Sequence, residues 1–461
     1  MIGTSAWQGH PYYDSRREPA DGLCVELPVT RLAVTYVLLV PLVLFAVHGG
    51  FSFEHSSWNS DLGARGGKMA MATTSGEALR DRIQTSVGLA FCLLAMAGYI
   101  RRLASFAQMM PLILVLPVYA MSSALWSQDA GTSLRSGLSL LVTTLFALYL
   151  AERFSERQQM DLFTLVGACV ATMNVVTAIG WPQFGIDHQV HEGALQGLFT
   201  QKNACAEATL FLLTPALAFP AMGRYGQMLR SAYISLCLLI ILATQSRTAW
   251  AITIVYFCFA ATLRILGRFG RKEVLPLAAA CFTFAGSLLV AAIAYPSVLL
   301  SLMGRPGGFS GRVEIWAAII ASIFRRPLTG FGFDAFWSKL TGEATRVFAA
   351  TGWVVTSAHS GFLNIALELG FIGLALVLLT FAQAFRHANA ALRAGHSGYV
   401  DWCIGIVFLT VVYNLDERTL MATQYLPWIL YIIACAGLRR GAAGHEWTET
   451  EMCPAGVSVE L

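Results

Sequence analysis

This sequence has few charged residues. Only 13% of its 461 residues are charged, against about a quarter in an ordinary soluble domain, whereas 56% are hydrophobic and the mean hydropathy is +0.60. A chain this poor in charge cannot cover a soluble surface, so we expect an all-α protein that crosses the membrane many times. The net charge of +4 comes from basic residues scattered through short loops, which argues against nucleic acid as a partner.

The sequence also lacks a cysteine or histidine framework. Its ten cysteines stand singly, without a C-x-x-C pair, so they predict neither a disulfide scaffold nor a zinc site. His188 and His191 look superficially like metal ligands, but no third partner stands near them. Internal repeats and low-complexity tracts are absent from the sequence too. We expect no metal and no cofactor.

Apolar segments of near-membrane length recur along the chain. They lie at about 32–49, 83–100, 104–124, 136–151, 160–180, 204–222, 231–245, 248–266, 274–295, 360–385, 398–414 and 420–438. These segments predict about 12 transmembrane helices over residues 32–438, between polar tails at 1–31 and 439–461. The first apolar run follows Arg31 and lacks a small-residue cleavage site, so we interpret it as a retained helix.

The placement of lysine and arginine predicts the orientation. If the amino terminus is cytoplasmic, every inner connection carries at least two basic residues, as the positive-inside rule expects. Both termini are then cytoplasmic, and the large loop at 296–358 lies on the outer face. The short outer turns carry single basic residues, among them Lys202 and Arg247, against the insertion bias. Those two are candidates for binding, and the alternative is that they only reach toward lipid headgroups.

The large loop contains a second amphipathic pattern. From Arg312 to Arg326 the apolar residues recur at helical spacing on one side. A helix of about 15 residues is too short to cross a bilayer and is expected to lie in the headgroup plane, ended by Pro327 and the glycines after it. We interpret it as a lid over the outer mouth of the bundle. The alternative is a surface helix with no role in binding.

Two arginines and a histidine fall on the same predicted face. Arg247 and Arg312 together would form an anion site, because guanidinium groups present a fork that fits phosphate oxygens. His359 begins the following apolar segment, and histidine is neutral or charged close to pH 7, so it could take a proton from an attacking hydroxyl. The alternative for His359 is a helix cap or a satisfied polar group.

Other polar residues are weaker candidates. Lys202, Asn203, Arg325 and Arg326 could contact phosphate or sugar hydroxyls. Asp129 is expected to cap a turn, and Glu368 to be a buried polar anchor in the helix that starts near His359.

Five segments of the chain resemble one family. They are ALWSQDAGTSLR, GLFTQKNACAEATL, TQSRTAW, GRVEIWAAIIASIFRRPLTGFGFDAFW and AHSGFLNIALELGFIGL, and they occur in family order. At these residues the chain resembles the O-antigen ligase and polymerase superfamily, most closely the ExoQ-type exopolysaccharide polymerases. The resemblance implies a metal-independent, inverting glycosyltransferase at the periplasmic face of the bacterial inner membrane, with undecaprenyl-pyrophosphate-linked glycan as donor.

The same resemblance assigns roles to residues. Arg247 and Arg312 would hold the pyrophosphate, and His359 would activate the acceptor. Ser360 departs from the asparagine that many relatives have after the histidine, so no amide role is carried over to it. A chain-length regulator and a flippase of the same pathway are expected partners.

Three activities remain open at the level of sequence. A polymerase would extend the glycan with another lipid-linked repeat unit, whereas a ligase would transfer it to lipid A-core. A transporter or flippase for the lipid-linked glycan is the alternative of another class, for which paired charges deep in the helices and repeat symmetry would be expected. We favour the polymerase.

Overall fold

A computed structural model describes residues 38, 41–47, 75–99, 103–104, 106, 108, 110–188, 192–218, 223–269, 312–338, 342–351, 355, 357–395 and 397–443. Its helices are α2 (Ser75–Met96), α4 (Pro111–Ser122), α5 (Ala130–Arg153), α6 (Glu156–Gly180), α7 (Pro182–Gly185), α8 (Lys202–Ala218), α9 (Gly223–Ala243), α10 (Arg247–Phe269), α13 (Arg312–Ile323), α14 (Glu343–Thr351), α15 (Gly361–Ala394), α16 (Gly398–Tyr413) and α17 (Leu426–Ala442). One small antiparallel pair of strands joins β1 (Ile186–Asp187) to β2 (Ala194–Leu195).

The protein is an all-α membrane protein. Five helices of the described chain, α5, α6, α9, α10 and α15, are long and apolar enough to cross a membrane. All of them coincide with expected apolar segments. The segment at 274–295 and most of the one at 32–49 lie outside the described residues, so the count of twelve spans and the outer position of the large loop stay predictions.

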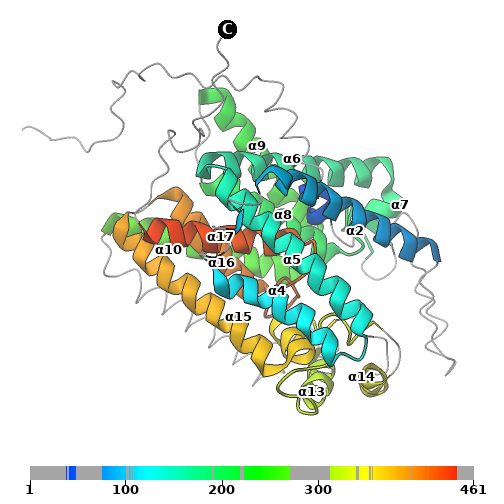
Figure 1. Cartoon of the computed structure of the whole chain (residues 1–461). Coiled ribbons are helices and arrows are strands. Elements are labelled where there is room, and N and C mark those ends of the chain that lie inside the picture. The colour runs from blue at the N-terminus through cyan, green and yellow to red at the C-terminus, as the bar shows by residue number, and fades with distance from the viewer. Residues whose placement is uncertain are drawn as a thin grey trace, which may run out of the picture.

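Helix α17 lies in the core of the bundle. It packs against α15, α16 and α5 (Figure 1), and Trp428 and Tyr431 on it are among the largest fully buried side chains. Both have polar partners on neighbouring helices: Trp428 Nε1 donates to Thr144 Oγ1 at 3.1 Å, and the Tyr431 hydroxyl is 2.7 Å from Thr380 Oγ1. Because the indole and phenol groups are satisfied, they tie the helices together at no desolvation cost.

Helices α13 and α14 lie together at one end of the bundle (Figure 1). The helix expected at 312–326 is present as α13, but its apolar face packs on protein: Ile315, Ile319 and Ile323 are buried in a second core with residues of α14 and α15. Ile320 and Phe324 on the other side stay exposed. Helix α14 was not predicted, because it is only nine residues long and its mean hydropathy is low.

The segment that follows α13 packs against a kink in α15. Gly370 has a non-helical backbone with φ of 68°, which frees the carbonyls before it. Gly332 N donates to the Glu368 carbonyl at 2.8 Å, and Phe371 N donates to the Pro327 carbonyl at 2.7 Å. Backbone approaches backbone here, so only a residue without Cβ fits at Gly370.

We expect Gly370→Ala to destabilise the protein by about 1–3 kcal/mol or more, because alanine is strained at this φ. Its Cβ would also lie 2.2 Å from the Leu328 carbonyl carbon. Thermal unfolding of the purified protein in detergent measures the loss. Gly180→Ala is the control, since a Cβ at that helix end meets nothing within 4 Å. Equal unfolding temperatures for the two variants would contradict this account of the kink.

Candidate functional site

Backbone strain gathers in four loops of the described chain. Among its residues, five that are not glycine have positive φ: Gln245, Asp334, His359, Met421 and Gln424. They lie between α9 and α10, after α13, before α15, and between α16 and α17. Hydrogen bonds and ion pairs join these loops to one another, as the next paragraphs describe. Strained residues persist where the surroundings over-determine them, and they cluster at functional sites.

His359 is held by the backbone on both sides of it. Trp316 Nε1 of α13 donates to the Ala358 carbonyl at 3.0 Å. After His359, Ser360 Oγ and Gly361 N both donate to the Asn414 carbonyl, at 3.2 Å and 2.9 Å. The start of α15 is thereby fixed between α13 and the loop after α16, and the His359 ring stays 26% exposed.

The His359 ring faces a carboxylate. Its Nδ1 lies 3.6 Å from Oε2 of Glu417, which belongs to the loop between α16 and α17. This is an ion-pair distance and too long for a hydrogen bond. Nδ1 is buried and has no hydrogen-bond partner among the described residues. A carboxylate in this place can orient an imidazole.

Glu417 connects His359 to the start of α10. Asn203 Nδ2 donates to Glu417 Oε1 at 3.2 Å, and Ser246 Oγ donates to Asn203 Oδ1 at 2.9 Å. Ser246 Oγ also accepts from Ala249 N at 3.3 Å, so it caps α10. Arg247 is the first residue of that helix, is exposed, and makes no hydrogen bond or ion pair with another described side chain.

The other candidate cations divide into two groups. Lys202 lies beside the Ser246 turn, since its Nζ donates to the Gln245 carbonyl at 3.3 Å. Arg325 forms an ion pair with Glu343 of α14, and Arg326 donates to the Trp126 carbonyl at 3.2 Å. These two arginines brace the loop that follows α13, whose last residue, Ile323, is about 10 Å along the helix from Trp316.

Arg312 is described only in its backbone. It starts α13, one turn before Trp316, whose indole reaches the residue next to His359. Its side chain lies outside the described residues, so a role in anion binding stays a prediction.

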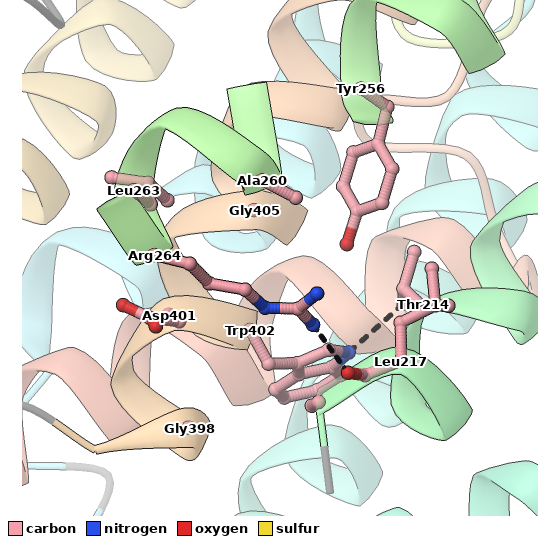
Figure 2. A pocket seen from close by; sticks show the side chains of 11 residues that line it. Thr214, Leu217, Tyr256, Ala260, Leu263, Arg264, Gly398, Asp401, Trp402 and Gly405 are labelled. Carbon is pink, nitrogen blue, oxygen red and sulfur yellow. Dashed lines mark hydrogen bonds between the residues drawn. The ribbon is translucent and has the colours of Figure 1, made fainter. Parts of the chain in front are cut away.

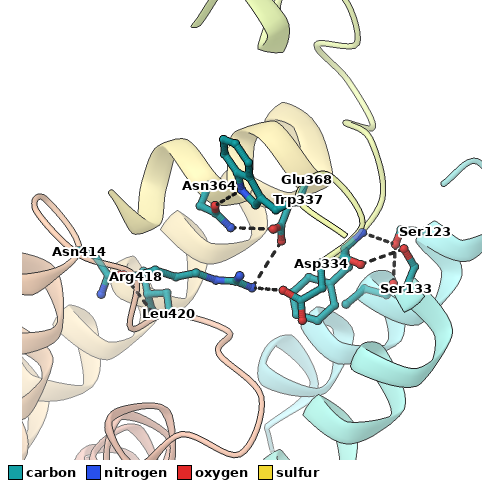
Figure 3. Close-up of polar contacts among 11 residues, drawn as sticks. Ser123, Ser133, Asp334, Trp337, Asn364, Glu368, Asn414, Arg418 and Leu420 are labelled. Atoms are coloured by element: carbon teal, nitrogen blue, oxygen red, sulfur yellow. Dashed lines mark hydrogen bonds and ion pairs between the residues drawn. The ribbon is translucent and has the colours of Figure 1, made fainter. Parts of the chain in front are cut away.

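Arg418 is the centre of a second polar network (Figure 3). Its Nη2 lies 2.7 Å from Asp334 Oδ1 and 3.5 Å from Glu368 Oε2. Burial lowers the pKa of the Arg418 guanidinium, but Asp334 and Glu368 raise it more, so its net pKa lies above the ordinary value. Asn364 Nδ2 donates to Glu368 Oε1 at 2.8 Å.

The two networks share one loop. Glu417 and Arg418 are consecutive, and they reach the His359 network and the Asp334 network respectively. Asn414 stabilises this loop, because its Oδ1 accepts from the backbone of Thr419 and of Leu420, each at 3.0 Å. The loop therefore fixes the His359 region and the segment after α13 relative to each other.

A cavity lies elsewhere in the bundle (Figure 2). It has a volume of about 40 Å³ and is lined by residues of α8, α10 and α16, including Thr214, Arg264 and Asp401. Thr214 is eleven residues beyond Asn203 on α8, which is about 16 Å along the helix axis. The cavity is therefore separate from the His359 network.

The described part of the chain contains no cluster of three or more histidine, cysteine or acidic residues that could hold a metal ion, and the expectation of no metal stays a prediction. His188 Nε2 lies 3.3 Å from the Pro182 carbonyl, and His191 is outside the described residues. Asp129 caps α5 by accepting from Thr132 N, as expected. Glu368 is 1% exposed in α15, which agrees with the expected buried anchor.

Sequence reasoning missed several residues of these networks. Glu417, Arg418, Asp334 and Ser246 received no role from the sequence. The signal that could have found two of them is the acidic and basic run at 416–418, which stands in a short turn between two apolar segments. Charged residues so close to a membrane span are functional candidates by default.

The fold and the site together define a class of protein. It is a polytopic helical membrane protein in which a histidine, a carboxylate and an exposed arginine lie at the ends of helices.

Residues 232–378 match the family model described as O-antigen ligase. The chain is similar to the exopolysaccharide production protein ExoQ of Rhizobium meliloti (strain 1021), with 24% identity over 290 residues. The match covers 59% of this chain and 64% of the relative, so it spans less than two thirds of that protein. The expected resemblance to the O-antigen ligase and polymerase superfamily is confirmed.

Proposed function

We propose that this protein is a glycosyltransferase of the polysaccharide polymerase type. It transfers a growing glycan from undecaprenyl pyrophosphate to the next lipid-linked repeat unit, at the periplasmic face of the bacterial inner membrane. Both termini are then cytoplasmic, and the reaction is metal-independent and inverting. The family match and the similarity to ExoQ support the reaction class.

One observation carries the proposal: His359, Glu417, Asn203 and the start of α10 at Arg247 are linked although they come from four separate parts of the chain. Glu417 orients the His359 ring, and the ring takes the proton of the acceptor hydroxyl as that oxygen attacks the anomeric carbon. The bond from the anomeric carbon to the pyrophosphate oxygen breaks, and the pyrophosphate leaves on the lipid.

The charge that develops on the leaving group needs cations. Arg247 is exposed and makes no bond to another described side chain, so the N–H groups of its guanidinium can donate to two phosphate oxygens at once. Arg312 begins α13, one turn before Trp316, and is the second cation of the proposal. Lys202 lies next to the Arg247 turn and adds positive charge there. Arg325 and Arg326 follow the end of α13, and their bonds to protein give them a supporting role.

Reconstitution separates polymerase from ligase. Purified protein in liposomes, given only a lipid-linked repeat unit, is expected to yield glycans of several repeats, which gel electrophoresis resolves by length. A ligase would leave the repeat unit unchanged until lipid A-core is added. A transporter would move the substrate between leaflets without changing its length, and that result would overturn the proposal.

A further inference from the structure

Two polar residues of α8 interact with the carboxylate of Glu417. Asn203 and Glu207 are four residues apart and therefore lie on one face of the helix, one turn from each other. The Asn203 amide donates to Glu417 at 3.2 Å. Glu207 is only 3% exposed and lies close enough to Glu417 for their charges to interact. The carboxylate beside His359 therefore has a second carboxyl group as a neighbour.

Three polar atoms of this pair and of the residues that interact with it have no partner among the described residues. Glu207 Oε1, the Tyr413 hydroxyl and His359 Nδ1 are all buried and have no hydrogen-bond partner in the described part of the chain. Tyr413 interacts electrostatically with both Glu207 and Glu417. Buried polar atoms normally have partners. Three of them around one carboxylate indicate a polar space in which a proton, or a water that carries one, completes the bonding.

The environment distinguishes the two carboxyl groups. Glu417 is the more exposed, with 15% of its side chain accessible, and it faces His359 and receives the Asn203 amide. Glu207 is hydrogen-bonded to the Tyr425 hydroxyl, and no described cation is paired with it. A second ionised carboxylate beside Glu417 is unfavourable in so buried a place, because like charges repel and the buried Glu207 is withdrawn from water.

We infer that Glu207 and Glu417 form a carboxyl pair that carries one proton, held on Glu207, so that Glu417 faces His359 as an anion. Glu207 is thus a positioning residue that acts on His359 through Glu417, and no bond to substrate is assigned to it. This inference rests on the proposed function for its catalytic consequence. The protonation of the pair does not depend on the substrate and can be measured without it.

Infrared difference spectroscopy of the purified full chain at neutral pH tests the pair directly. The spectrum of the wild type minus that of Glu207→Gln is expected to show the carbonyl stretch of a protonated carboxylic acid. The spectrum of the wild type minus that of Glu417→Gln should instead show a carboxylate band. If Glu417→Gln removes the acid band, or if both variants remove only carboxylate, the inference is wrong.

Kinetic measurements then test whether Glu207 acts on His359 through Glu417. Glu207→Leu should lower kcat about tenfold and change KM for the lipid-linked donor by less than about twofold, because only the orientation of the base is affected. Glu207→Gln keeps a neutral group that can donate a hydrogen bond, so it should restore most of kcat. In the Glu417→Gln background, adding Glu207→Leu should lower kcat little further. In a double-mutant cycle, this non-additive result shows that the two residues act together.

Thr209→Val is the matched control. It also removes a buried polar group from α8, whose hydroxyl donates to the Cys205 carbonyl at 2.7 Å, away from Glu417. Both the infrared bands and kcat should stay as in the wild type. Equal losses from Glu207→Leu in the two backgrounds would assign Glu207 a purely structural role. A correct infrared result with no transfer by the wild type would overturn the proposed function and leave the carboxyl pair standing.

Discussion

Polymer growth is expected to stop when His359 is replaced by alanine. A positioned general base contributes roughly 10² to 10⁴ in rate, so His359→Ala should lower the rate of transfer by at least about a hundredfold. The loss should fall on kcat, because the proposal gives the imidazole no contact with the pyrophosphate. Polysaccharide extracted from cells that carry only the variant, separated by length, gives the first measurement, and single-turnover transfer in liposomes gives the rate.

The variant must remain in the membrane for this result to count. The substitution removes no hydrogen bond of the ring to a described residue, since Nδ1 lies 3.6 Å from Glu417 and is otherwise unpartnered. We therefore expect normal amounts of protein in the membrane fraction. His188→Ala, in the loop after β1, is the control and should leave chain length unchanged. Normal chain length in His359→Ala would remove this histidine from the mechanism.

The sequence predicted the helices well because membrane spans are long and apolar. The segment at 136–151 lies within α5, and the segment at 360–385 begins one residue before α15, which continues beyond it to Ala394. Short elements were missed for the same reason: α14 has nine residues, and the β1 and β2 strands have two each. Their formation depends on packing and backbone pairing with distant parts of the chain, which local apolar content does not record.

The sequence predicted which residue types form the candidate site, but only some of the contacts between them. His359, Arg247 and Asn203 stood out because each is polar at the end of an apolar segment. Glu417 did not, since its link to Asn203 spans 214 positions of sequence and exists only because α8 and α16 pack together. The sequence also offered Arg325 and Arg326 as substrate contacts, whereas the structure pairs them with Glu343 and the Trp126 carbonyl.

Removing the Arg418 charge is expected to have the largest effect on stability. Arg418→Met would leave Glu368, which is 1% exposed, and Asp334 without their shared cation. An uncompensated buried charge typically costs about 3–5 kcal/mol, and the partial exposure of Asp334 favours the lower end of that range. The thermal unfolding temperature of the purified protein should fall. Transfer should fall with it, because Arg418 is adjacent to Glu417 in the loop that faces His359.

A compensating variant distinguishes charge from packing. In Arg418→Met with Glu368→Gln, the buried group is neutral and can still accept from Asn364 Nδ2, which donates to Glu368 at 2.8 Å in the wild type. Much of the lost stability should return, since the cost arises from an unpaired charge and not from a cavity. Arg418→Lys keeps the charge but not the fork that spans two carboxylates, so an intermediate loss is expected. If the double variant is no more stable than Arg418→Met, then the guanidinium stabilises this loop by packing against Phe333, 5.9 Å from its ring centre, and the ion pairs contribute little.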